Sequence, residues 1–439
     1  MTRNAFFELA EGLAAGLSGD EVLFCLLDGE DSDFVRLNRN RIRQAGSVQR
    51  RTLELNLVSG TRQVAGRCEL AGGLTQDGPL SQDLLRRLRD RLSHVPEDPY
   101  LDFSTTPSSS ERSLGGDLPD AGQAVSTLIA GAQGMDLVGI WASGQIVSGL
   151  ASSLGHRHWH RSASFNLDWS CYLDKDKAVK SGYSGFDWDA DRLGAKLDGV
   201  RRGLDAMARP AWKLSPGRYR AYLAPEAAQE LTDILAWGGF GLKSHRTSQT
   251  PLMRLVDGER TLDRRISIRE EHARGRAPGF TAQGFIKPER VDLILDGEFR
   301  HCLVDSRSAK EYGVPVNAGA EYPESLALDA GEIPLSEVLN RLDTGLYIGN
   351  LWYLNYADRN DCRVTGMTRF GTFWVENGEV VAPVEVMRFD DSLYHLLGDR
   401  LEGITREREL ILSAETYGGR STASNLLPGV LVGGIELTS

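Results

Sequence analysis

The chain has 439 residues, of which 41% are hydrophobic and 25% are charged, so it can bury sizeable cores and wholesale disorder is excluded. The formal net charge of −11 lacks the concentrated positive charge that nucleic acids and anionic membranes attract, so we expect neither as a partner. The five cysteines are scattered singly and no stretch of 18 apolar residues occurs, which argues against a disulfide framework and a membrane span. A cytoplasmic location is expected.

The first half of the chain alternates between helical and strand patterns. Helices are expected over 2–17, 81–94 and 190–208, and strands over 21–27, 34–38, 42–58, 61–70 and within 136–180. Asx-Gly pairs at 28–29, 257–258, 296–297 and 377–378 predict hairpin turns. Residues 104–120 are rich in Ser, Thr, Pro and Gly, which indicates an exposed loop.

Proline and glycine at 209–210 and 215–217 break the chain and predict a domain boundary there. A strand over 218–223 then precedes a helix whose first turn holds Pro225, and most segments after residue 291 have strand character. We therefore expect an α+β fold. Its N-terminal mixed domain, residues 1–210, has long antiparallel strands and a loop near 104–120, and its C-terminal domain, residues 215–439, is β-rich.

Three histidines, His156, His158 and His160, alternate along a predicted strand and therefore share one of its faces. Histidine is a common zinc ligand, so this face is a candidate metal site. The outer two positions lie about 13 Å apart at about 3.3 Å per residue, so all three cannot reach one ion. Two of them with a distant carboxylate or cysteine could. The simpler interpretation is a polar, solvent-facing strand with Trp159 turned to the core.

Motifs for nucleotide binding and serine hydrolysis do not match. The glycine-rich run at 238–244 fails the phosphate-loop spacing, and no G-x-S-x-G elbow occurs. Cys362 lies in a polar segment, 358–366, where an exposed thiol could act as a nucleophile or a metal ligand. No histidine lies in that segment, so an idle loop thiol is the simpler interpretation.

The C-terminal segment 366–390, GMTRFGTFWVENGEVVAPVEVMRFD, resembles the closing strands of the TldD/PmbA family, also called TldD/TldE. The block 155–170, GHRHWHRSASFNLDWS, is similar to the family's middle segment, and the long strands of 33–70 followed by the helix at 81–94 are similar to its N-terminal domain. The resemblance covers nearly the whole chain. It implies a two-domain α+β protein from a family whose two kinds of subunit pair as a heterodimer.

In the TldD-type subunit, the resemblance implies a zinc metallopeptidase with an H-E-x-x-x-H helix, whose two histidines bind the ion and whose glutamate is the general base. Aligned by order, residues 225–235, PEAAQELTDIL, stand at that helix and contain no histidine. The only nearby pairing of the two residue types, Glu270-Glu271-His272, has the wrong order. The chain therefore resembles the TldE/PmbA type, and we assign no catalytic residue and no metal or other cofactor to it.

These expectations predict a non-catalytic subunit of a zinc metallopeptidase complex that processes unfolded peptides, with the zinc in a TldD-like H-E-x-x-x-H partner. The peptide would add as a strand to a sheet edge, and the segment with Arg369, Phe370, Phe373 and Trp374 is a candidate peptide-binding or interface region. Two alternatives stay open. One is an independent metal-dependent hydrolase that uses the His156–His160 strand; the other is a homodimeric modulator protein without protease activity.

Overall fold

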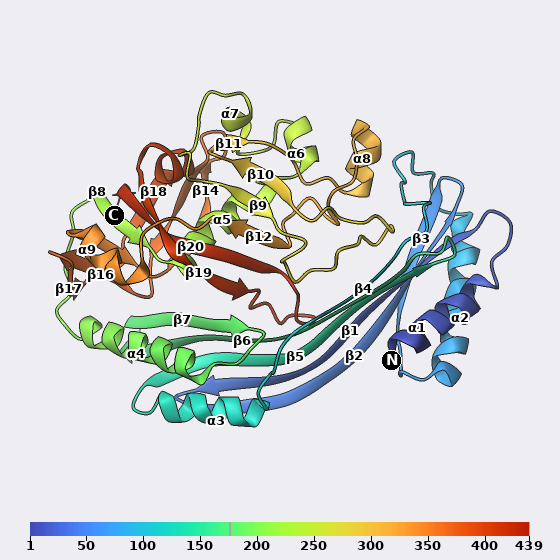
Figure 1. Cartoon of the computed structure of the whole chain (residues 1–439), viewed down its shortest axis with the longest axis horizontal. Helices are drawn as coiled ribbons and strands as arrows, with labels where there is room; N and C mark the ends of the chain where they lie inside the picture. The colour runs from blue at the N-terminus through green and yellow to red at the C-terminus, as the bar shows by residue number, and fades with distance from the viewer. Residues whose placement is uncertain (175–176, 439) are drawn as a thin grey trace.

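The structure is a computed structural model that describes residues 1–174 and 177–438. Two β-sheets with helices packed against them give the expected α+β fold, a long twisted sheet below and a second, curled sheet above (Figure 1). The chain crosses from the first sheet to the second between Met207 and Gly217. Within the described residues, no helix has the length and apolar character needed to cross a membrane.

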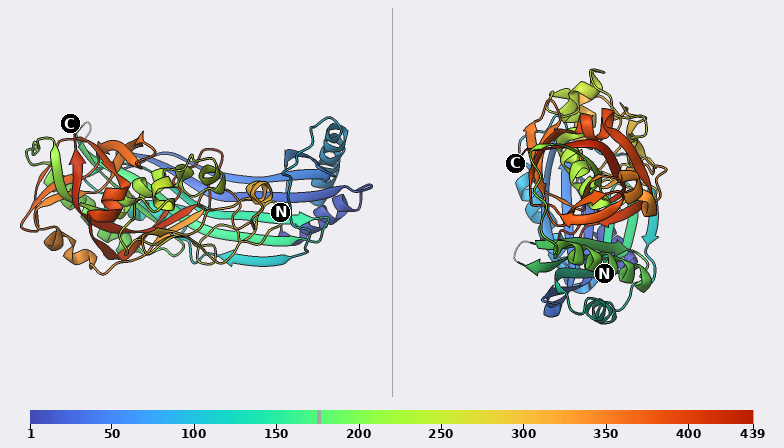
Figure 2. Two further views of the ribbon diagram at one scale, coloured as in Figure 1. Left: turned by 90° about the horizontal axis from the view of Figure 1, so that it is seen from above. Right: turned by 90° about the vertical axis from the view of Figure 1, so that its left-hand side faces the viewer.

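The first sheet is built from the N-terminal part of the chain. Its strands are β1 (Val22–Asn38), β2 (Arg41–Ser59), β3 (Arg62–Glu69), β4 (Ser109–Leu114), β5 (Asp136–Ser152), β6 (Arg157–Asp174) and β7 (Lys177–Gly185). They follow the order β3-β2-β1-β5-β6-β4, and β7 pairs with β6 further along that strand. Only β4 runs parallel to its neighbour. The resulting sheet is elongated, as the view from above shows (Figure 2).

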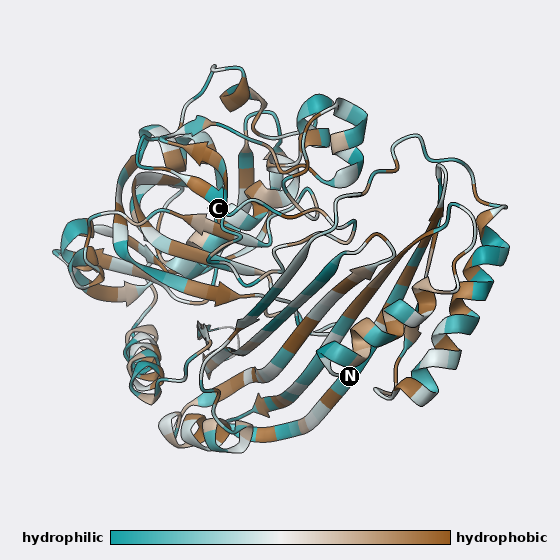
Figure 3. Cartoon of the chain, turned by 45° about the vertical axis from the view of Figure 1, so that its right-hand side comes forward, coloured by the Kyte–Doolittle hydropathy of each residue, from teal (hydrophilic) through white to brown (hydrophobic). Residues whose placement is uncertain are grey.

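Four helices, α1 (Arg3–Ala14), α2 (Leu74–Leu92), α3 (Ala121–Gly131) and α4 (Ala190–Met207), cover this sheet. α1 and α2 lie at one end and α3 and α4 at the other (Figure 1). Each end has its own core, because each helix pair turns an apolar stripe towards the strands. Leu88 of α2 packs with Leu55 of β2 in one core, and Leu197 of α4 with Trp169 of β6 in the other. Both helix pairs carry hydrophobic and hydrophilic residues side by side (Figure 3).

The second sheet contains the strands from residue 217 onward. They are β8 (Gly217–Leu223), β9 (Ile268–Glu270), β10 (Val291–Leu295), β11 (Glu298–Phe299), β12 (Ser325–Leu328), β13 (Gly345–Ile348), β14 (Leu351–Asp358), β15 (Arg363–Thr368), β16 (Thr372–Glu376), β17 (Glu379–Pro383), β18 (Arg388–Ser392), β19 (Leu401–Leu412) and β20 (Ser424–Leu437). β20 is central, since it pairs with β8, β12, β18 and β19.

Short helices connect these strands, and one longer helix fills the concave side of the sheet. The short ones are α6 (Leu242–Arg246), α7 (Met253–Val256), α8 (Ser306–Tyr312), η1 (Leu335–Glu337), α9 (Val338–Leu342) and η2 (His395–Asp399). The longer one, α5 (Pro225–Gly239), packs against β20, with Leu231 and Leu235 in the same core as Val430. This packing fixes α5 beside the first sheet.

Several sequence-based expectations are wrong in detail. The Asp-Gly pair at 28–29 lies inside β1 instead of a turn, because β1 pairs along its length with β2 on one side and β5 on the other, and these ladders override the local preference. The helix expected over 81–94 begins earlier, at Leu74. The loop expected at 104–120 contains β4, which pairs with β6. The hairpins at 296–297 and 377–378 are confirmed.

Two of the contacts between the sheets bring β4, β6 and β7 against the second half of the chain. At one, the loop of residues 271–290 lies against β4 and the start of β6, where Arg112 donates to the carbonyl oxygens of His272 at 2.9 Å and Gly275 at 3.0 Å. At the other, β19 contacts β6 and β7, and Ser184 donates to the carbonyl oxygen of Leu410 at 2.8 Å. Between these contacts the guanidinium of Arg420 donates to Ser164 of β6.

Candidate functional site

A cleft between the two sheets is lined by the first turns of α5. β8 leads directly into this helix, Pro225 stands in its first turn, and residues such as Leu231 face the core. Its polar face presents Glu226, Gln229 and Glu230 to a cavity of about 120 Å³. The rest of the wall includes Asn166, Asp168, Lys180, Tyr183, Ser184, Asn350, Glu409 and Leu412.

The acidic groups of this helix are poorly solvated. Burial raises the pKa of the Glu226 carboxyl, although the charges of Lys196 and Lys180 act in the opposite direction. Burial and then the neighbouring charge of Asp233 raise the pKa of Glu230. The cleft wall is therefore acidic on the α5 side, with lysine charges of the first sheet and α4 facing it.

A charged contact closes one side of the cleft. The carboxylate of Glu409 on β19 lies 3.0 Å from Lys196 and 3.0 Å from Arg192, both on α4. Lys196 is the more buried of the two cations, with 17% of its side chain exposed. This contact ties the second sheet to the helix that covers the first, so it fixes the width of the cleft.

The cleft does not fit the zinc site that the family resemblance implies. α5 reads PEAAQE from Pro225, so a glutamate keeps the second place of H-E-x-x-x-H, but proline and Glu230 stand where the two histidines would be. Within the described residues, no three His, Cys, Asp or Glu donors of this cleft lie within 4.8 Å of one another. No metal-dependent step can therefore be assigned to these residues.

The predicted histidine strand lies elsewhere, beside the loop of residues 271–290. His156, His158 and His160 do share one face, as their spacing predicts, but they are buried, with 0%, 0% and 1% exposure. The expectation of a solvent-facing strand is wrong, because Phe280 from the second sheet's loop covers this face and stacks on His158. Trp159 turns to the other face, where it packs in the core with α1.

Most of the ring nitrogens on this face already have hydrogen-bond partners. The two nitrogens of His158 lie 3.0 Å from Ser108 Oγ and 2.8 Å from Ser110 Oγ. Nδ1 of His156 lies 2.6 Å from Ser152 Oγ, and Nε2 of His160 donates to the carbonyl oxygen of Arg276 at 2.8 Å. Burial lowers the pKa of His158 and of His160 to about 4, so both rings are neutral at pH 7.

Cys362 is buried in the core of the second sheet rather than exposed in a loop. Burial raises the pKa of its thiol to about 12, so the reactive thiolate form is suppressed at neutral pH. The expectation of an exposed thiol is wrong, because the segment before β15 folds inward and Cys362 accepts a backbone hydrogen bond from Leu393. Its position favours a packing role.

The four residues predicted to contact a peptide or a partner separate into two pairs. Arg369 and Phe370 lie in the turn between β15 and β16, where the Arg369 guanidinium lies 4.6 Å from the Trp352 ring centre. Phe373 is buried against α4, with Met207, and Trp374 stacks on Trp212 with ring centres 6.3 Å apart. Both pairs stand beside exposed aromatic residues: the first beside Trp352 and Tyr353, and the second beside Trp212.

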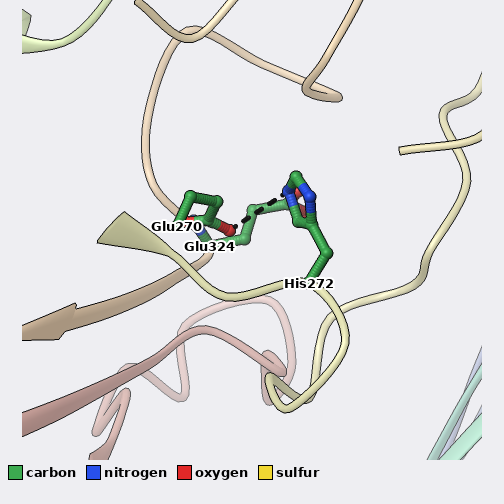
Figure 4. Close-up of side chains that lie close together, drawn as sticks. All are labelled: Glu270, His272 and Glu324. Atoms are coloured by element: carbon green, nitrogen blue, oxygen red, sulfur yellow. Dashed lines mark hydrogen bonds and ion pairs between the residues drawn. The ribbon is translucent and has the colours of Figure 1, made fainter. Parts of the chain in front are cut away.

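A further group of three polar side chains lies close together in the structure, although the sequence did not indicate that they would meet. Glu270 at the end of β9, His272 two residues later and Glu324 directly before β12 converge, with one donor atom of each within 4.8 Å of the others (Figure 4). Their proximity follows from topology, because β9 and β12 are antiparallel neighbours. The i, i+2 spacing of Glu270 and His272 is the only part of this cluster that the sequence could have indicated. Glu324 follows 54 residues after Glu270, so no local pattern links it to the other two.

Comparison with known proteins places this architecture in a family. Residues 216–439 match the model of the PmbA/TldA metallopeptidase C-terminal domain. The chain is 28% identical over 202 residues to the metalloprotease PmbA of Escherichia coli O157:H7, a match that covers 44% of this chain and 43% of that protein. The chain thus spans less than half the length of this curated relative.

The structural similarity to solved proteins covers nearly the whole chain. The crystal structure of TldE from Thermococcus kodakarensis superposes with a TM-score of 0.79 at 12% sequence identity, over 99% of this chain and 100% of that one. At this identity the similarity demonstrates a common fold. Together with the match of its C-terminal half, this shows that the chain belongs to the PmbA/TldA metallopeptidase family, as the closing segment 366–390 had indicated.

Proposed function

We propose that this chain is a non-catalytic, TldE-like subunit that pairs with a zinc-bearing H-E-x-x-x-H subunit in a cytoplasmic peptidase complex. The observation that carries the proposal is helix α5, which begins with Pro225, presents Glu226 and Glu230 to the cleft and contains no histidine. Zinc, its activated water and the general base would then all belong to the partner. The five free cysteines accord with a reducing compartment.

The cleft supports a role in holding an unfolded peptide. In the described part of the chain, β7 pairs with β6 on one side only, and its residues 180–184 line the cleft. A strand with one free edge offers unpaired N–H and C=O groups to an extended peptide, and such pairing tolerates many sequences. The cavity of about 120 Å³ is smaller than the roughly 300–1,000 Å³ of common ligand pockets, so the partner subunit would complete the site.

Co-expression with an H-E-x-x-x-H paralogue from the same genome tests this proposal. We expect the two chains to co-purify, the pair to cleave unfolded peptides, and each chain alone to be inactive. Two results would overturn it: peptide cleavage by this chain alone, or a fully active paralogue that never binds it. A homodimer that ignores the paralogue would favour the modulator alternative.

A charge reversal in the cleft tests the peptide site within the pair. Lys180→Glu places a second acidic group opposite Glu226 and Glu230, so it should raise KM for peptides with little change in assembly. Lys310→Glu, on the exposed face of α8, is the matched control and should leave both properties unchanged. Equal behaviour of the two variants would argue against binding at β7.

A further inference from the structure

Glu270, His272 and Glu324 form a cluster outside the cleft whose geometry suits a metal ion (Figure 4). Two of the three are almost inaccessible to solvent: the side chain of Glu270 is 1% exposed and that of His272 is 3% exposed. Glu324 is 35% exposed and gives the cluster a route to solvent. The carboxylate of Glu270 is held in place by the backbone N–H groups of Glu324 at 3.1 Å and Ser325 at 2.9 Å.

The imidazole of His272 is fixed in the form that binds metals. Its Nδ1 lies 2.7 Å from the carbonyl oxygen of Pro288, which can only accept, so Nδ1 carries the proton. Nε2 therefore presents a lone pair, and this buried atom has no hydrogen-bond partner. A histidine that donates one ring N–H to a backbone carbonyl and points its other nitrogen at carboxylates has the surroundings of a typical metal ligand.

The separation of the donor atoms also favours a bound ion. Nε2 of His272 lies 3.5 Å from Oε1 of Glu270, which is long for a hydrogen bond between these groups. Two atoms bound tetrahedrally to zinc at about 2.1 Å are about 3.4 Å apart.

We propose that Glu270, His272 and Glu324 bind one divalent transition-metal ion of the Zn²⁺ type. An imidazole nitrogen with two carboxylate oxygens suits such ions, whereas Mg²⁺ and Ca²⁺ favour oxygen donors in larger number. The site lies on the second sheet and not on the cleft side of α5, so it is separate from the peptidase zinc of the family. This metal site goes beyond the proposed function, because it takes no part in peptide cleavage by the proposed complex.

The same geometry indicates a structural role for the ion. It would join β9, the loop of residues 271–290 and the residue before β12. The carbonyl oxygens of this loop bind Arg112 of β4, and its Phe280 covers the buried histidines of β6. An ion bound at His272 would therefore hold the loop against the first sheet and stabilise the contact between the two sheets.

Lys287 provides a sharp test of the idea. Its ammonium group, with 2% of the side chain exposed, donates to Glu324 and lies beside the cluster. A positive charge at this position competes with a cation for the Glu324 carboxylate. Lys287→Gln removes this charge and should therefore tighten zinc binding about tenfold or more, whereas a purely structural ion pair would respond only by loss of stability.

The measurement is zinc stoichiometry and affinity in the purified single chain, by elemental analysis and competition with a chromogenic chelator. We expect close to one ion per chain, an increase in melting temperature with Zn²⁺, and no such increase with Mg²⁺. His272→Leu and Glu324→Gln should weaken binding about tenfold or more. Because Glu324 is partly exposed, its variant provides the test even where His272→Leu does not fold.

Two controls separate this site from others. His94→Gln, at an exposed histidine, and the double variant His158→Ala, His160→Ala should retain the ion. The proposal is overturned if the wild-type chain binds no zinc, if Glu324→Gln binds as well as wild type, or if the double variant alone abolishes binding. The last result would move the site to the β6 histidines. Because all measurements use the single chain, they do not depend on any peptidase partner.

Discussion

The imidazole of His158 stacks on the ring of Phe280, with ring centres 4.9 Å apart and an angle of 22° between the planes. His158 lies on β6 of the first sheet and Phe280 lies in the loop of residues 271–290 between two strands of the second sheet, so this contact is part of the boundary between the sheets. On the other side of His158 the stack continues through His156 to Phe24. The face of β6 that carries three polar histidines is thereby packed against apolar rings.

Buried neutral histidines predict loss of stability in mild acid. Burial depresses the pKa of His158 and of His160 to about 4, and Arg112, Lys287 and Arg276 add positive charge around His160. The unfolded chain binds protons near pH 6.5, so stability is fully present above that pH and falls as the pH drops towards 4. At pH 5 the expected loss is on the order of 2 kcal/mol per histidine.

Urea unfolding at a series of pH values between 7 and 4.5 measures this effect. The His158→Gln variant should show a flatter pH dependence than wild type, whereas His94→Gln, on the surface, should follow wild type. Parallel curves for wild type and His158→Gln would mean that His158 takes up its proton in the folded state.

A glycine in the loop of residues 271–290 gives a second prediction about stability. Gly284 has φ +82°, and a Cβ there would lie 2.8 Å from Nε2 of the buried His156 ring. Gly284→Ala should therefore destabilise the chain by about 1–3 kcal/mol. Gly279→Ala in the same loop meets no atom within 4 Å and should be close to neutral. Equal melting temperatures for the two variants would contradict the close packing at His156.

The contacts of Arg420 between the two sheets give a third prediction about stability. Its guanidinium donates to Ser164 at 2.7 Å and 2.9 Å, and its backbone N–H lies 3.3 Å from the buried carboxylate of Glu30. Desolvation lowers the pKa of Arg420 to about 10, although the charge of Glu30 partly offsets this. Arg420→Ala should cost about 1.5–3 kcal/mol, because Ser164 loses its hydrogen bonds from a charged donor and the Glu30 carboxylate loses a nearby positive charge, although it keeps the backbone N–H and Arg50.

Guanidinium-induced unfolding of Arg420→Ala, compared with the exposed Arg406→Ala, measures that cost. The double variant Arg420→Ala, Glu30→Gln should recover part of the lost stability, since the buried charge is removed. A double variant that is no better than Arg420→Ala would place the energy in the Ser164 hydrogen bonds instead.

The local elements of this chain could be predicted because their causes are local. Pro225 and the apolar spacing after it specify α5, and the absence of histidine on that helix is visible in the sequence. The burial of the β6 histidines could not be predicted in this way. His160 bonds to Arg276, 116 positions away, and no local pattern reports that pairing.

The same limit applies to the cluster of Glu270, His272 and Glu324. The first two residues have strand spacing, and their sequence order argues only against a helical zinc motif. Their third member becomes a neighbour because β9 pairs with β12, a relation that depends on the whole second sheet. Conversely, the Asp-Gly pair at 28–29 has a strong turn preference that the paired neighbours of β1 override.

The acidic face of α5 gives the last prediction. Burial raises the pKa of Glu226, so the charged form of this carboxyl is disfavoured in the folded chain. The free energy of unfolding is therefore highest below pH 4.5, the pKa of the carboxyl in the unfolded chain, and it falls as the pH rises and Glu226 ionises. Glu226→Gln removes this cost, and the excess of its melting temperature over that of wild type should grow as the pH rises above 4.5 and level off above the folded pKa of Glu226. Glu8→Gln, on the exposed side of α1, is the control. If Glu226→Gln instead melts lower at every pH, the attraction of Lys196 and Lys180 outweighs desolvation, and Glu226 is held as a charged group at the cleft.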